Sequence, residues 1–238
     1  MVFPQLNFNS KLALTAKQMA QVDKLAAEGF NLQIRQMMEL ATFQMARLIR
    51  HTSNIKAKPI LILAGKGNNG ADAVASARIL ANWGAKPTII VPKQINSHSQ
   101  HHLNLAKSLK IPIYHSLQLI KQPAILIDGL LGYSIKGEIR QPYKSQIEYI
   151  NGLNIPVYSL DLPSGLNPDD GSIHGLAVKA THTLTLAYPK KGLFAKSAKK
   201  YIGQLYLADI GIPSVVYQQI KGIKYQNPFT QASLLKLT

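Results

Sequence analysis

The sequence predicts an α/β fold with a mostly parallel sheet, and two observations lead to this prediction. From residue 59 onward, short runs rich in Ile, Val and Leu alternate with segments of helical periodicity. The runs are continuously apolar, which is typical of strands covered by helices on both faces. The expected strands are 59–64, 87–92, 111–115, 123–128 and 156–161, later ones are 181–186 and 204–207, and the helices lie at about 71–83, 98–109 and 142–152.

The first 55 residues are expected to form helices that pack on the sheet or on a second subunit. Thr15 and Gln18 have the spacing of a capping box, which predicts a helix to about Ala27 that ends at Gly29. Asn31 is the candidate cap of a second helix. Its apolar residues recur at helical spacing and its methionines are expected to fill the core; they are Leu32, Met38, Ala41, Met45 and Leu48.

The composition is that of a folded protein, and we expect one domain over residues 1–238. Hydrophobic residues make up 46% of the chain, and no internal repeat or low-complexity linker divides it. No apolar run reaches the roughly 18 residues that a membrane span needs, and the N-terminus has no signal-peptide pattern. The absence of cysteine excludes disulfides, thiolate zinc sites and a cysteine nucleophile. These features indicate a cytoplasmic protein without a membrane partner.

The chain is strongly basic, with 27 Lys and Arg against 11 Asp and Glu and a net charge of +16. The lysines are scattered, and this favours a solvated surface over a dedicated site, although such a field also attracts small polyanions. The sequence argues against nucleic acid as a partner, because basic and aromatic residues do not interleave. The one denser stretch holds Lys190, Lys191, Lys196, Lys199 and Lys200. Three histidines at helical spacing, His98, His101 and His102, indicate a solvated helix face rather than a metal site.

The most informative segment is the turn after the strand 59–64. Gly65, Gly67 and Gly70 allow the backbone to approach a ligand closely, and free N–H groups at the start of the next helix attract phosphate. The spacing also fits the dinucleotide-binding motif of dehydrogenases. That motif expects a carboxylate about 20 residues further on, where the chain has Lys93. The dehydrogenase interpretation is therefore weak, and the sequence has no P-loop motif.

Polar residues also follow two later strands, at what would be the same edge of a parallel sheet. Asp128 follows one strand, while Asp161 and Ser164 follow the next. With Asn69 from the glycine turn, Asp128 and Ser164 supply hard oxygen donors with a single negative charge, which suits a monovalent cation. Asp161 is the candidate acid/base residue of this crevice, and the alternative is that it caps a turn.

Three ordered motifs resemble the YjeF N-terminal domain family, the NAD(P)H-hydrate epimerases. They are Gly67-Asn68-Asn69-Gly70-Ala71-Asp72, Asp128-Gly129-Leu130-Leu131-Gly132 and Asp161-Leu162-Pro163-Ser164-Gly165. The likeness covers about 200 residues. It implies a Rossmann-like three-layer α/β/α sandwich, a homodimer and interconversion of the R and S hydrates of NADH and NADPH at C6 of the nicotinamide ring. It also implies that a separate dehydratase completes the repair.

The resemblance also implies site residues. Substrate contacts fall on Asn68, Asn69, Gly70, Ala71, Asp72, Gly132, Tyr133, Ser134, Ile135, Lys136, Gly137, Glu138, Tyr143 and Asp161. One potassium ion per subunit would be held by Asn69, Asp128 and Ser164.

The chain departs from the family pattern at several positions. Ala71 and Ala73 replace two glycines of the turn, and the segment Gly132-Tyr133-Ser134-Ile135 replaces Gly-Thr-Gly-Leu. Leu40 and Thr42 stand where the family favours asparagine and glycine. Two alternatives to the epimerase remain open, namely a catalytically inactive dimerisation module that contacts nucleotide, RNA or protein, and another sugar- or nucleotide-modifying enzyme.

Overall fold

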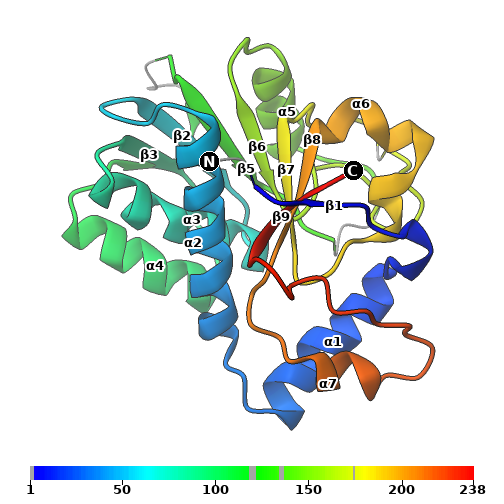
Figure 1. Ribbon diagram of the computed structural model, residues 1–238. Coiled ribbons are helices and arrows are strands. Elements are labelled where there is room, and N and C mark those ends of the chain that lie inside the picture. The colour runs from blue at the N-terminus through cyan, green and yellow to red at the C-terminus, as the bar shows by residue number, and fades with distance from the viewer. Residues whose placement is uncertain (1–2, 118–121, 134–136, 174) are drawn as a thin grey trace.

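A computed structural model describes residues 3–117, 122–133, 137–173 and 175–238. Within these ranges one nine-stranded sheet has the order β1-β9-β8-β7-β6-β5-β2-β3-β4 (Figure 1). Neighbouring strands are parallel except for β8 and β9. The strands are β1 Gln5–Leu6, β2 Pro59–Ala64, β3 Lys86–Ile90, β4 Ile113–Tyr114, β5 Ile125–Gly129, β6 Val157–Leu160, β7 His182–Leu186, β8 Gln204–Ala208 and β9 Leu234–Leu237. The predicted α/β class with a mostly parallel sheet is confirmed.

Helices cover both faces of this sheet. On one face α2, α3 and α4 lie side by side, and α1 packs with α7 beyond the end of the sheet (Figure 1). The helices are α1 Ala16–Gly29, α2 Ile34–Thr52, α3 Asn68–Asn82, α4 Ser97–Ser108, α5 Tyr143–Asn151, α6 Lys199–Ile202 and α7 Ser214–Gln218, and the 3₁₀ turns are η1 Ser10–Leu12, η3 Lys191–Phe194 and η4 Lys196–Ala198.

The central strand β2 shows how the three layers arise. Ile60 and Ile62 belong to the core on the side of α2 and α3, while Leu61 and Leu63 belong to the core that contains Ile147 of α5. Successive side chains of a strand point to opposite faces, so a strand buried on both faces must be apolar at every position. The continuous apolar run that predicted this strand thus corresponds to the α/β/α sandwich.

The N-terminal helices form as predicted, with one exception. Thr15 and Gln18 make the expected capping box of α1, in which the Gln18 N–H donates to Thr15 Oγ1 and the Thr15 N–H donates to Gln18 Oε1. Asn31 does not cap α2: its φ is 55°, and Gln33 is the N-cap residue. Asparagine is well tolerated in this left-handed region, so Asn31 turns the chain between the helices instead.

Sequence order and strand order diverge around β2, and this determines where a site can form. The chain runs from β2 through α3 to β3 on one side, whereas β5 pairs with β2 on its other side. In such sheets a crevice opens at the carboxyl ends of the strands, at the point where the order reverses. The glycine turn after β2 and Asp128 in β5 both lie at that point.

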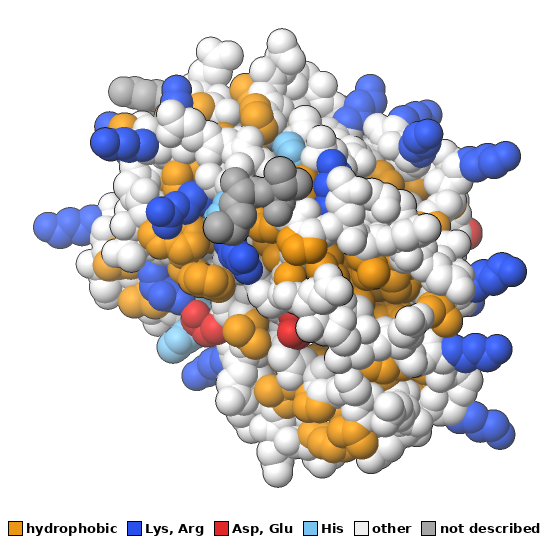
Figure 2. Space-filling model, viewed as in Figure 1, with side chains coloured by type: hydrophobic (Ala, Val, Ile, Leu, Met, Phe, Trp, Pro, Cys, Tyr) orange, Lys and Arg blue, Asp and Glu red, His pale blue; other side chains and the backbone are white. Residues whose placement is uncertain are grey.

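The surface agrees with the charge pattern of the sequence. Lys and Arg side chains are distributed over the face shown in Figure 2 and lie mainly around its rim, with apolar side chains between them. Among the described residues, none of the helices is long and apolar enough to span a membrane.

Candidate active site

The turn between β2 and α3 depends on two of its three glycines for folding. A Cβ on Gly65 would lie 1.8 Å from the Leu130 carbonyl oxygen, and one on Gly70 would lie 2.0 Å from the Gly65 carbonyl oxygen. The backbone therefore approaches itself at these positions. A Cβ on Gly67 meets nothing within 4 Å. Gly67 is the N-cap of α3 and lines a cavity, so Gly67 alone of the three leaves open space for a ligand.

Asn69 and the buried residues Asp128 and Ser164 are joined in one cluster around the Leu131 backbone. The Ser164 hydroxyl donates to Asp128 Oδ1 at 2.6 Å, and the Leu131 N–H donates to Ser164 Oγ at 2.9 Å. Asn69 Nδ2 donates to the Leu131 carbonyl oxygen at 3.2 Å. The Asp128 carboxylate also accepts bonds from the Ser159 hydroxyl and the Ser164 N–H. Burial raises the pKa of Asp128, and the hydrogen bonds from Ser164, Ser159 and Leu130 oppose that rise.

The donor set of this cluster fits a monovalent cation. Asp128 is fully buried, and no ion pair to it occurs in the described part of the chain. A buried carboxylate without a positive partner is costly. Rotation of the Asn69 amide by half a turn would direct its oxygen toward the Leu131 carbonyl, giving several neutral oxygens beside one carboxylate.

Asp161 lies at the end of β6 in a strained conformation. Its φ is 65°, which is uncommon for a residue with a side chain, and such strain clusters at active sites. The carboxylate forms a buried ion pair with Lys190 and accepts the Leu186 N–H at 3.2 Å. Only 5% of Asp161 is exposed. Asp161 thus has a buried cation as its partner rather than the role of a simple turn cap.

Lys190 corrects the sequence-based expectation that its stretch is a solvated surface. It is 1% exposed, and its Nζ also donates to the Leu186 carbonyl oxygen at 2.9 Å. A lysine can be buried in this way when its ammonium group is paired and hydrogen-bonded. A signal was present in the sequence, because Lys190 follows the strand next to the one that delivers Asp161.

A second pair of polar side chains crosses the site beside Asp161. The Tyr133 hydroxyl donates to Asp23 Oδ2 at 2.6 Å, and Lys190 Nζ lies 6.0 Å from the centre of the Tyr133 ring. Burial raises the pKa of Asp23, and the hydrogen bond from Tyr133 opposes it. Burial, together with the nearby Asp23 carboxylate, raises the pKa of Tyr133. Tyr133 therefore ties its loop to α1. No role for Asp23 was predicted, since nothing in the sequence places α1 at this cavity.

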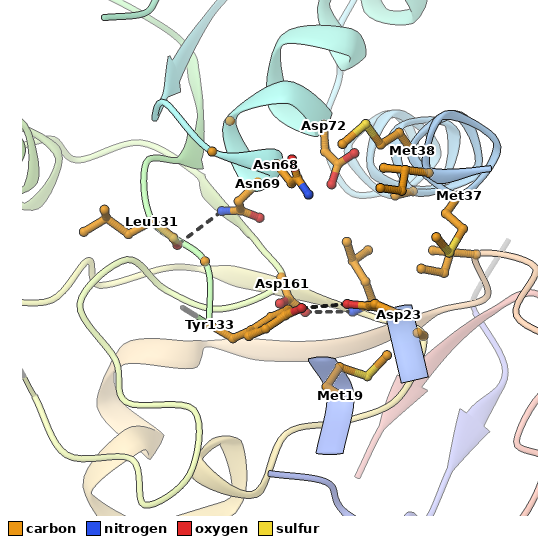
Figure 3. Close-up of a pocket in the computed structure, with 18 of the residues that line it drawn as sticks. Met19, Asp23, Met37, Met38, Asn68, Asn69, Asp72, Leu131, Tyr133 and Asp161 are labelled. Carbon is orange, nitrogen blue, oxygen red and sulfur yellow. Dashed lines mark hydrogen bonds between the residues drawn. The ribbon is translucent and has the colours of Figure 1, made fainter. Parts of the chain in front are cut away.

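A cavity of about 540 Å³ connects these groups. Figure 3 shows Asn68, Asn69 and Asp72 on one side of it and Tyr133, Asp161 and Asp23 on the other. Its walls also contain apolar side chains, including Met19, Met37 and Met38. Met45 fills the core as predicted, whereas Met38 lines the cavity, so only part of the methionine stripe is simple core packing. An apolar cavity with a few polar groups is the usual form of a small-molecule site.

The predicted substrate contacts divide into three groups. Those that line the cavity are Asn68, Asn69, Gly70, Asp72, Gly132, Tyr133, Tyr143 and Asp161. Ala71, Gly137 and Glu138 are outside its lining, as are the cation-site residues Asp128 and Ser164. Ser134, Ile135 and Lys136 lie outside the described residues.

The histidine face of α4 differs from its prediction. His102 is buried, at 3% exposed, and burial lowers its pKa, whereas His101 is exposed. The helix packs against α3, so one of its faces is turned away from solvent. Within the described residues, these histidines form no group of three or more potential metal ligands.

Comparisons with known proteins show the family of this chain. A family model described as YjeF-related protein N-terminus matches residues 34–192. NAD(P)H-hydrate epimerase of Limosilactobacillus reuteri is 32% identical over 206 residues, which cover 85% of this chain and 97% of that protein. NAD(P)H-hydrate epimerase of Nitrosopumilus maritimus is 32% identical over 209 residues, covering 85% and 96%.

A longer relative and a solved structure extend the likeness. The bifunctional NAD(P)H-hydrate repair enzyme Nnr of Dictyoglomus turgidum is 36% identical over 187 residues, which cover 76% of this chain and 36% of that protein. A crystal structure of the yeast protein YNL200c has the same fold, with a TM-score of 0.80 and 24% identity over 94% of this chain and 99% of that chain. The chain belongs to the YjeF-related protein N-terminus family.

Proposed function

We propose that this protein is an epimerase that interconverts the R and S forms of NADHX and NADPHX, the C6-hydrated nicotinamide nucleotides. The relatives with full-length similarity carry this activity in their names. One structural observation carries the proposal for this chain: Asp161, strained and paired with Lys190, faces a cavity that also reaches the open glycine turn. A reactive carboxylate and an anion-attracting helix start thus share one site.

The chemistry follows from the substrate. C6 of the hydrated ring bears a hydroxyl group next to the ring nitrogen, whose lone pair can expel it as water once the oxygen is protonated. Water then returns to the opposite face of the planar iminium and inverts the centre. Asp161 is positioned to exchange a proton with an oxygen in the cavity. The free N–H groups around Gly67 and Asn68 are positioned to hold the pyrophosphate while the ring reacts.

Potassium is the cation that this proposal assigns to Asn69, Asp128 and Ser164. Bound there, it would supply a positive charge to the buried Asp128 carboxylate. Through the Leu131 backbone, the cluster orients the chain that leads into Gly132 and Tyr133. Its residues therefore shape the wall of the cavity and take no part in proton transfer.

The proposed assembly and setting extend the same account. A homodimer is supported by Leu40 and Phe43 of α2, which are 42% and 47% exposed although both are large and apolar. A cysteine-free chain is suited to the cytoplasm. A dehydratase acting on the same hydrate is the expected pathway partner, since the longer relatives are named as bifunctional repair enzymes.

A chromatographic time course with (R)-NADHX and (R)-NADPHX tests the activity and its central residue. The wild-type protein should form the S hydrates faster than buffer does, and Asp161→Asn should lower that rate by about 10²-fold or more. Asparagine tolerates the positive φ at this position, but the variant leaves the buried Lys190 ammonium group without its carboxylate, so circular dichroism must show that the variant is folded before the rates are compared. Glu148→Gln removes the same charge from an exposed position on α5 and serves as the control. Equal rates for Asp161→Asn and wild type would remove Asp161 from the mechanism.

A further inference from the structure

The cavity contains a second carboxylate with unusual surroundings, that of Asp72. Asp72 lies in α3 and is 8% exposed, and its Oδ1 is buried without a hydrogen-bond partner among the described residues. It lines the cavity, and in Figure 3 it projects from the wall that faces Asp161. Buried polar atoms are nearly always hydrogen-bonded, so a carboxyl group that lines a cavity and keeps one buried oxygen without a partner is a candidate for a role toward a ligand.

The charges around Asp72 favour its neutral form. Burial raises its pKa well above the usual value, and the negative charges of Asp161 and Asp23 raise it further. The other charged side chains that line the cavity are Lys24, Glu28, Lys66 and Lys190. Lys24 pairs with Glu28 and Lys190 pairs with Asp161, and no ion pair to Asp72 is found in the described ranges.

Asp161 has the opposite environment on the other side of the cavity. It is paired with the Lys190 ammonium group and accepts hydrogen bonds from the Leu186 N–H and from Thr185 Oγ1. Asp161 thus has one cation and two hydrogen-bond donors around its carboxylate, whereas no such partner of Asp72 Oδ1 is found among the described residues. Two carboxyl groups in such different surroundings on opposing walls are the arrangement that acid/base catalysis uses to divide its roles.

We propose that Asp72 is a second catalytic residue, which acts as the general acid on one face of the nicotinamide ring while Asp161 acts as the general base on the other. This inference rests on the proposed epimerase function and changes its mechanism from one catalytic carboxyl group to two. Inversion at C6 requires the hydroxyl group to leave from one face and water to arrive at the opposite face. Carboxyl groups on opposing walls can serve both faces without rotation of the ring.

The two steps balance as follows. The neutral Asp72 carboxyl group gives its proton to the C6 hydroxyl group, the C–O bond breaks, and the nitrogen lone pair forms the iminium. Water then attacks the other face and loses a proton to the Asp161 carboxylate. Asp72 ends as a carboxylate and Asp161 as a carboxylic acid. Proton exchange with solvent restores the starting state, and the reverse reaction uses the two groups in exchanged roles.

Substitutions at Asp72 test this role directly with NADHX as the substrate. Asp72→Asn should lower kcat by about 10²-fold, with a much smaller change in KM. It should also abolish the loss of kcat/KM at high pH that deprotonation of the acid causes in the wild-type protein. Glu148→Gln should leave both unchanged, since Glu148 is exposed on α5. A wild-type pH profile and kcat in Asp72→Asn would overturn the proposal.

Chemical rescue separates a catalytic role from a structural one. Asp72→Ala creates space for a small carboxylic acid. Added formate should therefore raise the rate of this variant by about tenfold or more over its rate without formate. The increase should be larger at lower pH, where more formic acid is present. A structural defect has no reason to respond to formate. Absence of rescue in a folded Asp72→Ala protein, as judged by circular dichroism, would contradict the proposal.

The protonation state of Asp72 has a readout that does not depend on activity. A carboxyl group whose pKa is raised in the folded state stabilises it at low pH relative to high pH, and loses this contribution as pH rises through the folded pKa. Asparagine does not titrate, so the Tm of Asp72→Asn should rise relative to wild type by a few degrees between low and high pH. A constant difference in Tm would show that Asp72 is not held neutral.

The outcomes also separate this inference from the function on which it rests. If the wild-type protein does not accelerate epimerisation, the proposed function fails whatever the variants do. If the wild-type protein is active and Asp161→Asn is inactive while Asp72→Asn is fully active, the function stands and the two-carboxyl mechanism is wrong.

Discussion

At the residue scale, the Asp161–Lys190 pair brings together two charges that the chain cannot bury separately. Both side chains are almost completely removed from solvent, and each supplies the partner that the other needs. The strained backbone of Asp161 is held from both sides, because its N–H donates to the Leu184 carbonyl oxygen at 2.7 Å while its carboxylate accepts the Leu186 N–H. The pair thereby fixes the candidate catalytic carboxylate against the carboxyl-terminal end of β7.

Replacement of Lys190 should therefore destabilise the folded protein. Lys190→Met leaves Asp161 buried without its cation, and we expect the free energy of unfolding to fall by about 3 kcal/mol. The double variant Asp161→Asn/Lys190→Met should recover much of that loss, because no unpaired charge remains. Urea denaturation of Lys190→Met, Asp161→Asn and the double variant measures the three losses in the free energy of unfolding. Additive losses would show that the two side chains are not energetically coupled.

The Tyr133–Asp23 hydrogen bond gives a second prediction at this scale. Tyr133→Phe removes a 2.6 Å bond and leaves the Asp23 carboxylate without that donor, at an expected cost of about 1.5 kcal/mol. Since this bond lowers the pKa of Asp23, its loss should raise that pKa, which NMR titration can follow. Tyr149→Phe is the matched control, because Tyr149 is also partly buried and no hydrogen bond of its hydroxyl group is found among the described residues. Equal stability of the two variants would contradict a role for the bond.

At the scale of elements, the turn between β2 and α3 is built by backbone packing that only glycine permits. Gly70→Ala should destabilise the protein by several kcal/mol or prevent folding, because its Cβ would overlap the Gly65 backbone at 2.0 Å. Gly67→Ala should change the free energy of unfolding by less than about 1 kcal/mol, because its φ is −95° and its surroundings are open. Thermal unfolding of the two variants compares them directly, and equal effects would refute this division of roles.

The sequence predicted the elements whose patterns are local. Apolar runs located β2, β5 and β6, and Thr15 with Gln18 located the start of α1, because burial on two faces and capping each leave a mark within a few residues. The antiparallel strand β9 and its partner β1 were not predicted. They are four and two residues long, and their pairing depends on contacts between the two ends of the chain.

In the candidate site too, some residues can be recognised from short motifs and others only from the tertiary structure. The glycine turn and Asp161 were identified from motifs, since both follow strands directly. Asp23 becomes part of the site only through the placement of α1 against the sheet, which no short pattern records, whereas the position of Lys190 after β7 was a signal that the sequence analysis did not use. The lysine-rich composition of its segment even favoured the wrong environment for Lys190.

At the scale of the whole molecule, potassium should stabilise the folded protein if it binds the Asn69, Asp128 and Ser164 cluster. A cation that binds only the folded state adds RT ln(1 + [K⁺]/Kd), about 2.7 kcal/mol at 100 times Kd. The Tm should therefore be higher in KCl than in choline chloride at equal ionic strength. The variant Asn69→Ala should lose that difference. The same Tm of the wild-type protein in both salts would argue against a potassium site.

The central claim, that the cavity inverts C6 through loss and return of water, is tested most directly by isotope incorporation. Purified (R)-NADPHX would be incubated with the protein in potassium-containing buffer made with ¹⁸O water, and the products analysed by chromatography and mass spectrometry. The account predicts that the S hydrate accumulates faster than in buffer alone and carries one ¹⁸O atom at C6. Formation of the S hydrate at the uncatalysed rate, or its rapid formation without ¹⁸O, would contradict the account.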